Sequence, residues 1–377
     1  MKKILFNNIR QTYNFTRNLE LLFSDYELIR KKHFSNLCLD KLNDIYPNCE
    51  LFLTHSATGA LEMIASLIDV QVGDEIIMPS FTFVATANAF VSKGATPVFI
   101  DINPNTLNID ETLIEQAITP KTKAVIAMHY AGHPCKMNVL KEICKKHQLY
   151  LIEDAAVGFG NNYKDQALGS MGDFGAISFD VTKHISAVQG GLLLINNEKF
   201  KERANNIYHL GTNRNAFQKG ETPYYEWVDI GSKYQMNELN AAYLYDQLCQ
   251  SDEIFRIRQE LSKTYYSKLK FLEEKNLLRL IPKDLVGSNI HEFYIILNSK
   301  EERERLRIYL NQKNIEALFH YIPLHNTGMG LKTGRYVGAK FTEDISNRLL
   351  RLPFHTELTI NEVEYITSLI FNFFFNK

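Results

Sequence analysis

One lysine lies between two apolar runs near the middle of the chain, where its amine could act as a nucleophile. The runs are Phe174–Phe179 and Leu192–Ile195, and the polar segment between them holds Lys183 and ends in Gly190 and Gly191. Burial between strands favours the neutral form of an amine, because a charged group loses its hydration there. A neutral amine can form a Schiff base with a carbonyl compound. The alternative is a solvated surface charge, the common state of a loop lysine.

A turn of small residues could bind a phosphate group. The segment 54–59 separates a short apolar run from a helical pattern, so backbone N–H groups would lie at a helix start beside the hydroxyls of Ser56 and Thr58. Such N–H groups bind phosphate readily. Ser178, which ends the apolar run before the lysine, is a second possible phosphate contact. The alternative is a helix cap, because serine and threonine are favoured there for that reason alone.

An acid and an aromatic residue follow two further strand-like segments. Asp154 ends the segment 150–154, and Phe83 follows the segment 75–79, with Phe81 as the alternative aromatic. A carboxylate can hold a protonated pyridine nitrogen, and an aromatic ring can stack on a flat heterocycle. Structural alternatives are a carboxylate that caps a helix and a ring that fills the core. Taken in chain order, the turn, the aromatic, the acid and the lysine are the ligand set of a pyridoxal phosphate (PLP) enzyme of the aspartate-aminotransferase type.

These residues follow segments that alternate between strand-like and helix-like patterns. The alternation, with buried apolar strands, indicates an α/β fold with a mainly parallel sheet sandwiched by helices. Ligands bind beyond the carboxyl ends of the strands in such sheets, which is where the candidate residues fall. The expected strands are 51–53, 75–79, 97–101, 124–129, 150–154 and 192–195, and a helix is expected at 137–147.

The length of 377 residues suggests two domains. A long helical pattern from Met236 to Phe271 would link the large sheet to a smaller C-terminal domain, in which 291–297 and 315–321 resemble strands. We therefore expect a large domain at 1–245, including an N-terminal arm, and a small α+β domain at 246–377.

Composition narrows the kinds of partner. Lys and Arg (42) balance Asp and Glu (43), which argues against a nucleic-acid-binding face. The five cysteines form no CxxC pair, so a metal site and a disulfide framework are not expected. Apolar residues recur at helical spacing near the C-terminal end, but polar residues interrupt them, so we expect a docked helix and no membrane span. The expected location is the cytoplasm.

Several segments resemble the DegT/StrS family of PLP-dependent nucleotide-sugar aminotransferases, from about residue 50 onward. The resemblance implies an aspartate-aminotransferase-like (type I) fold with a seven-stranded sheet. Within the family, the segments Gly211–Arg214, Asp229–Ser232 and His320–His325 resemble the branch that makes dTDP-4-amino-4,6-dideoxygalactose. The segments are Pro79–Phe90, Asn108–Ile114, His129–Gly132, Glu153–Ala156, Gly211–Arg214, Asp229–Ser232 and His320–His325.

The resemblance also implies roles for individual residues. Lys183 would carry the cofactor and act as the catalytic base, with Asp154 at the pyridine nitrogen and Phe83 against the ring. The phosphate would lie against Ala57, Thr58, Gly59 and Ser178. The family works as a homodimer with shared active sites, so residues 211–214, with Asn213 and Arg214, and residues 229–236 would serve the partner's site. His320, Tyr321 and His325 would lie near the sugar nucleotide.

The implied reaction moves an amino group from L-glutamate to a 4-keto-6-deoxy sugar, with dTDP-4-keto-6-deoxyglucose as the expected substrate, for surface polysaccharide such as lipopolysaccharide O-antigen. Amination at C3 is the alternative within the same chemistry. Relatives that are sugar dehydratases carry histidine at the lysine position, so Lys183 argues against that reaction unless His184 replaces it.

Four residues depart from the family pattern. Val157 replaces a glutamine, Asp180 a common histidine, Gln189 the usual acid, and Lys233 an Asn or Ser. An acid that faced the amine of Lys183 would raise the lysine pKa, which is the wrong direction for a base. These changes leave open a member that binds a sugar nucleotide without turnover and acts as a regulator.

Overall fold

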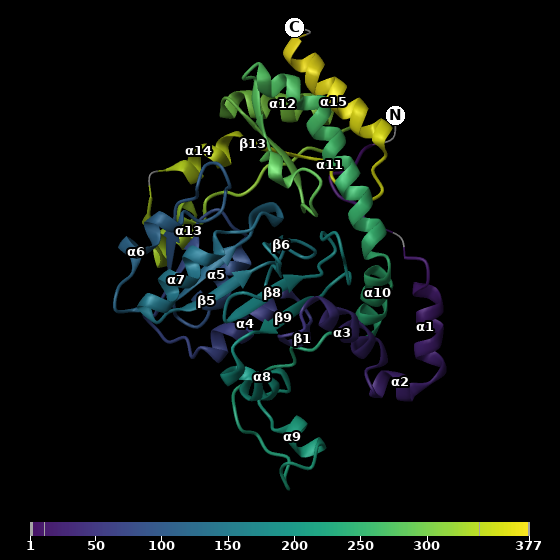
Figure 1. The fold of residues 1–377 in the computed structure, drawn as a ribbon, viewed down its shortest axis with the longest axis vertical. Coiled ribbons are helices and arrows are strands. Elements are labelled where there is room, and N and C mark those ends of the chain that lie inside the picture. The colour runs from purple at the N-terminus through teal and green to yellow at the C-terminus, as the bar shows by residue number, and fades with distance from the viewer. Residues whose placement is uncertain (1–2, 11, 339, 376–377) are drawn as a thin grey trace.

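The computed structural model describes residues 3–10, 12–338 and 340–375, so part of the expected N-terminal arm lies outside the described residues (Figure 1). A large sheet occupies the centre, a smaller sheet with its helices lies at one end, and an arm that includes α9 (Arg214–Gln218) extends from the other end.

The large sheet has eight strands within the described residues, in the order β1-β9-β8-β5-β4-β2-β3-β12. Only β9 runs against its neighbours, and the other pairings are parallel. The strands are β1 (Glu50–Thr54), β2 (Glu75–Pro79), β3 (Thr96–Ile100), β4 (Thr122–Met128), β5 (Tyr150–Asp154), β8 (Phe174–Ser178), β9 (Gly191–Ile195) and β12 (Arg335–Val337).

The expected α/β fold is confirmed, but the sheet has one strand more than the seven expected. The additional strand is β12, which pairs with β3 although Arg335 lies 237 positions after its partner Val98 in the sequence. The three residues of β12, Arg-Tyr-Val, form no apolar run that would indicate a strand. In the structure all three are only half-buried, so their positions do not require apolar side chains.

Helices cover both faces of the large sheet, so its strands are buried on both sides. On one face Ile76 and Met78 of β2 share a core with α4 (Ala57–Leu67), α5 (Val84–Val91) and α8 (Lys201–Tyr208). On the other face Ile77 and Val125 share a core with α3 (His33–Ile45), α6 (Ile114–Ala117), α7 (Met137–His147) and α10 (Glu238–Cys249). This burial explains why the strands appear in the sequence as continuous apolar runs.

The smaller sheet is antiparallel and has the order β10-β11-β13. Its strands are β10 (Leu278–Leu280), β11 (Phe293–Leu297) and β13 (Leu349–Leu352), and its core includes residues of α11 (Ser251–Glu274), α12 (Lys300–Gln312), α14 (Phe341–Arg348) and α15 (Ile360–Phe375). No helix in the described ranges is long and apolar enough to cross a membrane. The remaining α-helices and strands are α1 (Phe15–Ser24), α2 (Tyr26–Arg30), α13 (Gly328–Thr333), and the short pair β6 (Asn162–Tyr163) and β7 (Gln166–Ala167).

Two expected elements differ in the structure. The helical pattern from Met236 to Phe271 is two helices, α10 and α11, which meet at Gln250. The expected strand at 315–321 is absent, and this segment makes only single bridges, from Ile315 to Ile4 and from Leu318 to Arg351.

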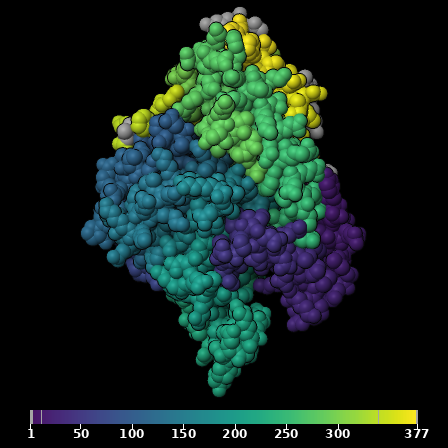
Figure 2. Space-filling model, viewed as in Figure 1, coloured from purple at the N-terminus to yellow at the C-terminus, as the bar shows by residue number. Residues whose placement is uncertain are grey.

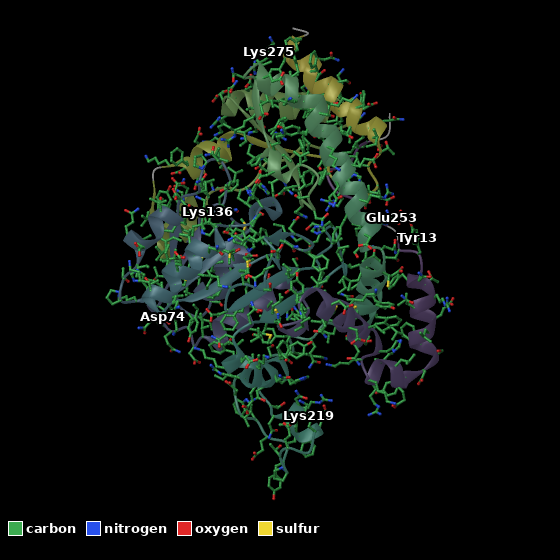
Figure 3. The ribbon with its side chains drawn as sticks, viewed as in Figure 1. Tyr13, Asp74, Lys136, Lys219, Glu253 and Lys275 are labelled. Atoms are coloured by element: carbon green, nitrogen blue, oxygen red, sulfur yellow. The ribbon has the colours of Figure 1, made fainter. Side chains whose placement is uncertain are left out.

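The N-terminal arm packs beside the linking helices. Figure 3 shows Tyr13 close to Glu253 of α11, and their side-chain oxygens are 3.4 Å apart. Arg10 pairs with the same glutamate at 2.7 Å. In the space-filling view the N-terminal arm and its helices lie against the α10–α11 segment (Figure 2).

Candidate active site

The candidate residues meet at one edge of the large sheet. Thr54, Asp154 and Ser178 end three strands that run in the same direction, and the neighbouring antiparallel strand begins at Gly191. The register places Gly191 opposite both Thr54 and Ser178. The carboxyl ends of the parallel strands therefore share an edge with the turn that carries Lys183.

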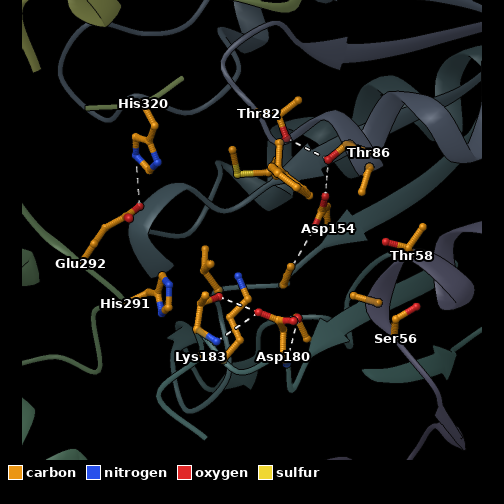
Figure 4. Close-up of a pocket in the computed structure, with 18 of the residues that line it drawn as sticks. Ser56, Thr58, Thr82, Thr86, Asp154, Asp180, Lys183, His291, Glu292 and His320 are labelled. Atoms are coloured by element: carbon orange, nitrogen blue, oxygen red, sulfur yellow. Dashed lines mark hydrogen bonds and ion pairs between the residues drawn. The ribbon is translucent and has the colours of Figure 1, made fainter. Parts of the chain in front are cut away.

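A cavity of about 570 Å³ opens at this edge. Figure 4 shows Lys183, Asp154 and Thr58 around the same space. The lining residues with polar side chains are Asn7, Ser56, Thr58, Thr82, Thr86, Asp154, Ser178, Asp180, Thr182, Lys183, Gln189, His291, Glu292, His320, Tyr321 and Arg351.

The amine of Lys183 is held in a state that favours reaction. Burial lowers its pKa below the ordinary value of 10.5, and this effect outweighs the opposing carboxylates of Glu292 and Asp180. Among the described residues, the amine has no hydrogen bond or ion pair. A desolvated lysine that lines a cavity without a partner suits nucleophilic or base chemistry.

Asp154 is buried, and a chain of hydroxyls orients its carboxylate. Thr86 donates from Oγ1 to Oδ2 at 2.6 Å, and the two threonine hydroxyls of Thr82 and Thr86 are 2.8 Å apart. Because the Thr86 proton points to Asp154, Thr86 must accept the proton of Thr82. The second oxygen, Oδ1, accepts the N–H of Ala156 at 3.2 Å. The carboxylate is thus fixed at the cavity wall.

The predicted phosphate turn is the start of α4. Ser56 is the N-cap, and its hydroxyl accepts the N–H of Gly59 at 3.0 Å. The N–H groups of Ala57 and Thr58, the first two residues of the helix, have no partner within the described part of the chain and adjoin the cavity. A Cβ at Gly191 would lie 2.4 Å from the nitrogen of Ala57, so glycine is required for strand β9 to approach this turn.

A profile of the DegT/DnrJ/EryC1/StrS aminotransferase family matches residues 50–371. The chain belongs to this family. The enzymes of the family use PLP, and the protein is a PLP-dependent aminotransferase. The expected family, enzyme class and cofactor are therefore confirmed.

Curated relatives of the aminotransferase come from an archaeon and a bacterium. The chain is 33% identical over 317 residues to an uncharacterised protein of Methanocaldococcus jannaschii, with 82% of each chain covered. It is 31% identical over 327 residues to GDP-perosamine synthase of Escherichia coli O157:H7, with 85% of each covered. Among solved structures, the fold matches that of PseC, a Helicobacter pylori aminotransferase involved in the biosynthesis of pseudoaminic acid, with a TM-score of 0.90, 24% identity and full coverage of both chains.

The residues of this aminotransferase fit PLP on structural grounds. The unpartnered N–H groups of Ala57 and Thr58 suit a phosphate, and the fixed carboxylate of Asp154 suits a protonated pyridine nitrogen. The free amine of Lys183 suits an aldehyde. These three features surround one cavity, as the cofactor would require.

The structure brings most, but not all, of the predicted site residues to this cavity. Ala57, Thr58, Phe83, Asp154, Ser178, Lys183, His320 and Tyr321 line it. Gly59 does not line it, and Phe81 is fully buried against Tyr130, whereas Phe83 is 60% exposed. His325 lies outside the cavity, where it bonds Ser80 at 2.6 Å and stacks on Tyr336.

Asn213 and Arg214 lie in the arm, which comprises residues 211–233, and do not line this cavity. The side chain of Asn213 closes the arm on itself, because it donates to the carbonyl of Tyr224 at 2.9 Å and accepts the N–H of Glu226 at 2.8 Å. Arg214 begins α9 and is exposed.

Three of the four unusual residues line the cavity, namely Val157, Asp180 and Gln189, whereas Lys233 is exposed elsewhere. Asp180 does not pair with the amine of Lys183. Its Oδ1 accepts the N–H and the hydroxyl of Thr182 at 3.0 and 2.8 Å, so its carboxylate caps the loop. Asp180 raises the lysine pKa only through space, and burial outweighs it.

A charged wall of the cavity comes from the small sheet and was not predicted. Arg351 of β13 pairs with Glu292 at 2.6 Å and donates to Nδ1 of His320 at 2.9 Å. Since arginine can only donate, His320 carries its proton on Nε2, which lies 2.7 Å from the hydroxyl of Tyr130. Burial raises the pKa of Glu292, although Arg351 and Lys183 oppose this. A single charge inside an apolar strand, as in Leu349–Leu352, was the available sequence signal.

The N-terminal segment also reaches the cavity. Phe6 and Asn7 line it, the guanidinium of Arg351 lies 4.5 Å from the ring centre of Phe6, and Asn7 donates to the carbonyl of Thr182 at 2.9 Å. This segment therefore contacts both the lysine loop and the small sheet.

Proposed function

We propose that the protein moves an amino group from L-glutamate to C4 of a nucleotide-linked 4-keto-6-deoxy sugar. The proposal goes beyond the family in naming the donor, the sugar and the reacting carbon. It also assigns Lys183 as the catalytic residue, and Ala57, Thr58, Phe83, Asp154 and Ser178 as cofactor contacts, whereas Gly59, whose N–H is bonded to Ser56, is not among them.

One observation carries the proposal. The unpaired amine of Lys183, with its pKa lowered by burial, faces the same cavity as the carboxylate of Asp154 and the open N–H groups at the start of α4. Val157 and Gln189 change the cavity wall, but neither removes this arrangement.

The chain's own residues would divide the chemistry between them. PLP, when bound, supplies the electron sink that makes the hydrogen on the amino-bearing carbon of glutamate acidic. The neutral amine of Lys183 takes that proton, and it later returns a proton to C4 of the sugar. Asp154, held by Thr86, keeps the pyridine nitrogen protonated, which maintains the electron sink.

The charged wall of the cavity supports an amino donor that carries a carboxylate group. Lys183 and Arg351 are the lysine and arginine side chains that line the cavity in the described ranges, and Lys183 is required for the chemistry. Arg351 is therefore left to bind a carboxylate of glutamate, which guanidinium groups hold through two parallel hydrogen bonds. Its pairing with Glu292 keeps the wall neutral when no carboxylate is present.

The sugar would enter on the side of His320 and Tyr321. The family resemblance of residues 211–325 favours dTDP-4-keto-6-deoxyglucose, whereas the curated bacterial relative is named for a GDP-linked sugar. We propose the dTDP sugar and keep a GDP-linked 4-keto-6-deoxyhexose as the second substrate to test. The product would serve surface polysaccharide synthesis in the cytoplasm.

We further propose a homodimer in which the arm serves the partner's site through Asn213 and Arg214. The arm projects from the molecule (Figures 1 and 2). It exposes large apolar side chains, including Tyr224, Trp227 and Ile230, at 70%, 78% and 75%. Exposed apolar surface of this kind is typical of an interface. We also propose the domain boundary at residues 245 and 246, with β12 returning to the large sheet.

The test follows the visible spectrum of the purified protein with PLP. L-glutamate should convert the enzyme-bound PLP to pyridoxamine phosphate, and dTDP-4-keto-6-deoxyglucose should reverse the change with formation of an amino sugar. Lys183→Ala should abolish both changes. Loss of the PLP band without any response to either sugar nucleotide would refute the proposed acceptor. A spectrum that ignores glutamate would instead support a binding protein, as Val157 and Gln189 would allow.

A further inference from the structure

Two buried histidines form a hydrogen-bonded chain that ends in the cavity. His184 follows the lysine, and His291 lies beside Glu292 just before β11 of the small sheet. Nε2 of His184 lies 2.9 Å from the carbonyl of Phe159, and Nδ1 of His184 lies 3.4 Å from Nδ1 of His291. Both side chains are less than one-tenth exposed, and only His291 lines the cavity.

The partners determine where each proton lies. A carbonyl oxygen can only accept, so His184 carries its proton on Nε2 and presents a lone pair at Nδ1. His291 must therefore carry its proton on Nδ1, which leaves a lone pair on Nε2. Burial lowers the pKa of both imidazoles, to about 3 for His184, so neither gains a second proton at neutral pH.

The lone pair of His291 has no partner among the described residues, although the side chain is more than nine-tenths buried. Figure 4 shows the ring between Lys183 and Glu292, at the edge of the cavity. Glu292 is a second acceptor on the same wall. A ligand group that meets these two residues must therefore donate a hydrogen bond, because carboxylates and phosphates carry only acceptors.

We propose that His291 accepts a hydrogen bond from a hydroxyl of the sugar substrate and that His184 holds it in the accepting state. This inference rests on the proposed function. Glutamate can donate only from its amino group, which is consumed in the reaction. A sugar hydroxyl can donate a hydrogen bond throughout the reaction. A fixed hydrogen-bond acceptor therefore suits the sugar and would favour its binding over that of glutamate.

The test measures the two half-reactions separately in His291→Leu and His291→Gln. Leucine removes the acceptor, whereas glutamine has similar volume and restores an oxygen. We expect His291→Leu to slow the sugar half-reaction about 10- to 100-fold and the glutamate half-reaction less than about twofold. His291→Gln should recover the sugar half-reaction to within about fivefold of wild type. His133→Leu is the matched control, because His133 is equally buried but does not line the cavity, and it should change neither rate.

Nitrogen-15 NMR of the histidine-labelled protein gives a readout that does not depend on activity. We expect the proton of His291 on Nδ1, and a proton on Nε2 would overturn the proposal. Equal losses in both half-reactions, or no loss in His291→Leu, would overturn it as well. A wild-type enzyme that accepts amino groups from glutamate but gives none to either sugar nucleotide would overturn the proposed function, and this inference with it.

Discussion

Replacing Glu153 by glutamine should destabilise the fold at the strand that carries Asp154. The buried carboxylate of Glu153 faces only donors. Oε1 accepts the N–H groups of Met171 and Gly172 at 2.5 and 2.7 Å, and Oε2 accepts the N–H of Gly169 at 2.9 Å. His129 adds a donor to Oε2 at 3.0 Å, since its Nδ1 already accepts the N–H of Cys135 and its proton must be on Nε2.

A glutamine in either orientation places its NH₂ group against two donors. Two hydrogen bonds to a charged group are then lost, each worth about 1.5–3 kcal/mol, so the free energy of unfolding should fall by about 3–6 kcal/mol. The unfolding entropy of a 377-residue chain is about 0.8 kcal/mol per degree, so the melting temperature should drop by about 4–8 °C.

Urea unfolding of wild type and Glu153→Gln without PLP measures this change. The control is Glu198→Gln, because the side chain of Glu198 is 86% exposed, and its effect should stay below about 0.5 kcal/mol. If Glu153→Gln lowered the free energy of unfolding by less than about 1 kcal/mol, the hydrogen-bond donors around Glu153 could rearrange, and the reasoning would be refuted.

Four further predictions concern the cavity. Thr86→Val removes one of the two hydrogen bonds to Asp154 and should weaken PLP binding about tenfold in an absorbance titration, whereas unchanged affinity would mean that Ala156 alone orients the carboxylate. Arg351→Gln should raise the KM for glutamate about 10- to 100-fold and affect the sugar half-reaction less, through the lost contacts to His320 and Glu292, and an equal effect on both half-reactions would count against a role in binding glutamate. The rate of reaction of the PLP-free enzyme with PLP should rise with pH to a plateau whose midpoint lies below 10.5, because only the neutral amine of Lys183 reacts and burial lowers its pKa. Glu292→Gln should move this midpoint lower, since the carboxylate raises the lysine pKa, and a midpoint at or above 10.5 would contradict the burial of the amine.

The sequence predicts best those elements whose apolar runs are continuous and end in turn residues. The strands 75–79 and 150–154 and the helix 137–147 have the predicted bounds, because each strand keeps adjacent apolar residues for the buried sheet and the helix repeats its apolar residues along one buried face. The segment 315–321 also has apolar residues, but its neighbours in space provide only single bridges. Strand β12 is missed for the opposite reason. It forms because it pairs with β3, which is distant in the sequence, and its own residues have no strand-like pattern.

The candidate site divides in the same way. Asp154, Ser178 and the turn at residues 54–59 could be placed together from the sequence, because the ends of parallel strands share an edge. Arg351, Glu292 and His291 could not, since the packing of a second sheet brings them to the cavity. The donor–acceptor order of Thr82, Thr86 and Asp154 depends on distances that no spacing in the sequence reveals.

The position of β12 has a consequence for the protein during its synthesis. Until residues 335–337 leave the ribosome, β3 is the edge strand of a sheet whose other strands can already pair. The backbone groups of β3 then have no partner on the side that β12 later covers. An apolar edge such as Thr96–Ile100 is a template for pairing with another chain. Fragments that stop before residue 335 should therefore aggregate rather than accumulate as inactive soluble protein, and folding in the cell should depend on protection of this edge by a chaperone until translation has passed it.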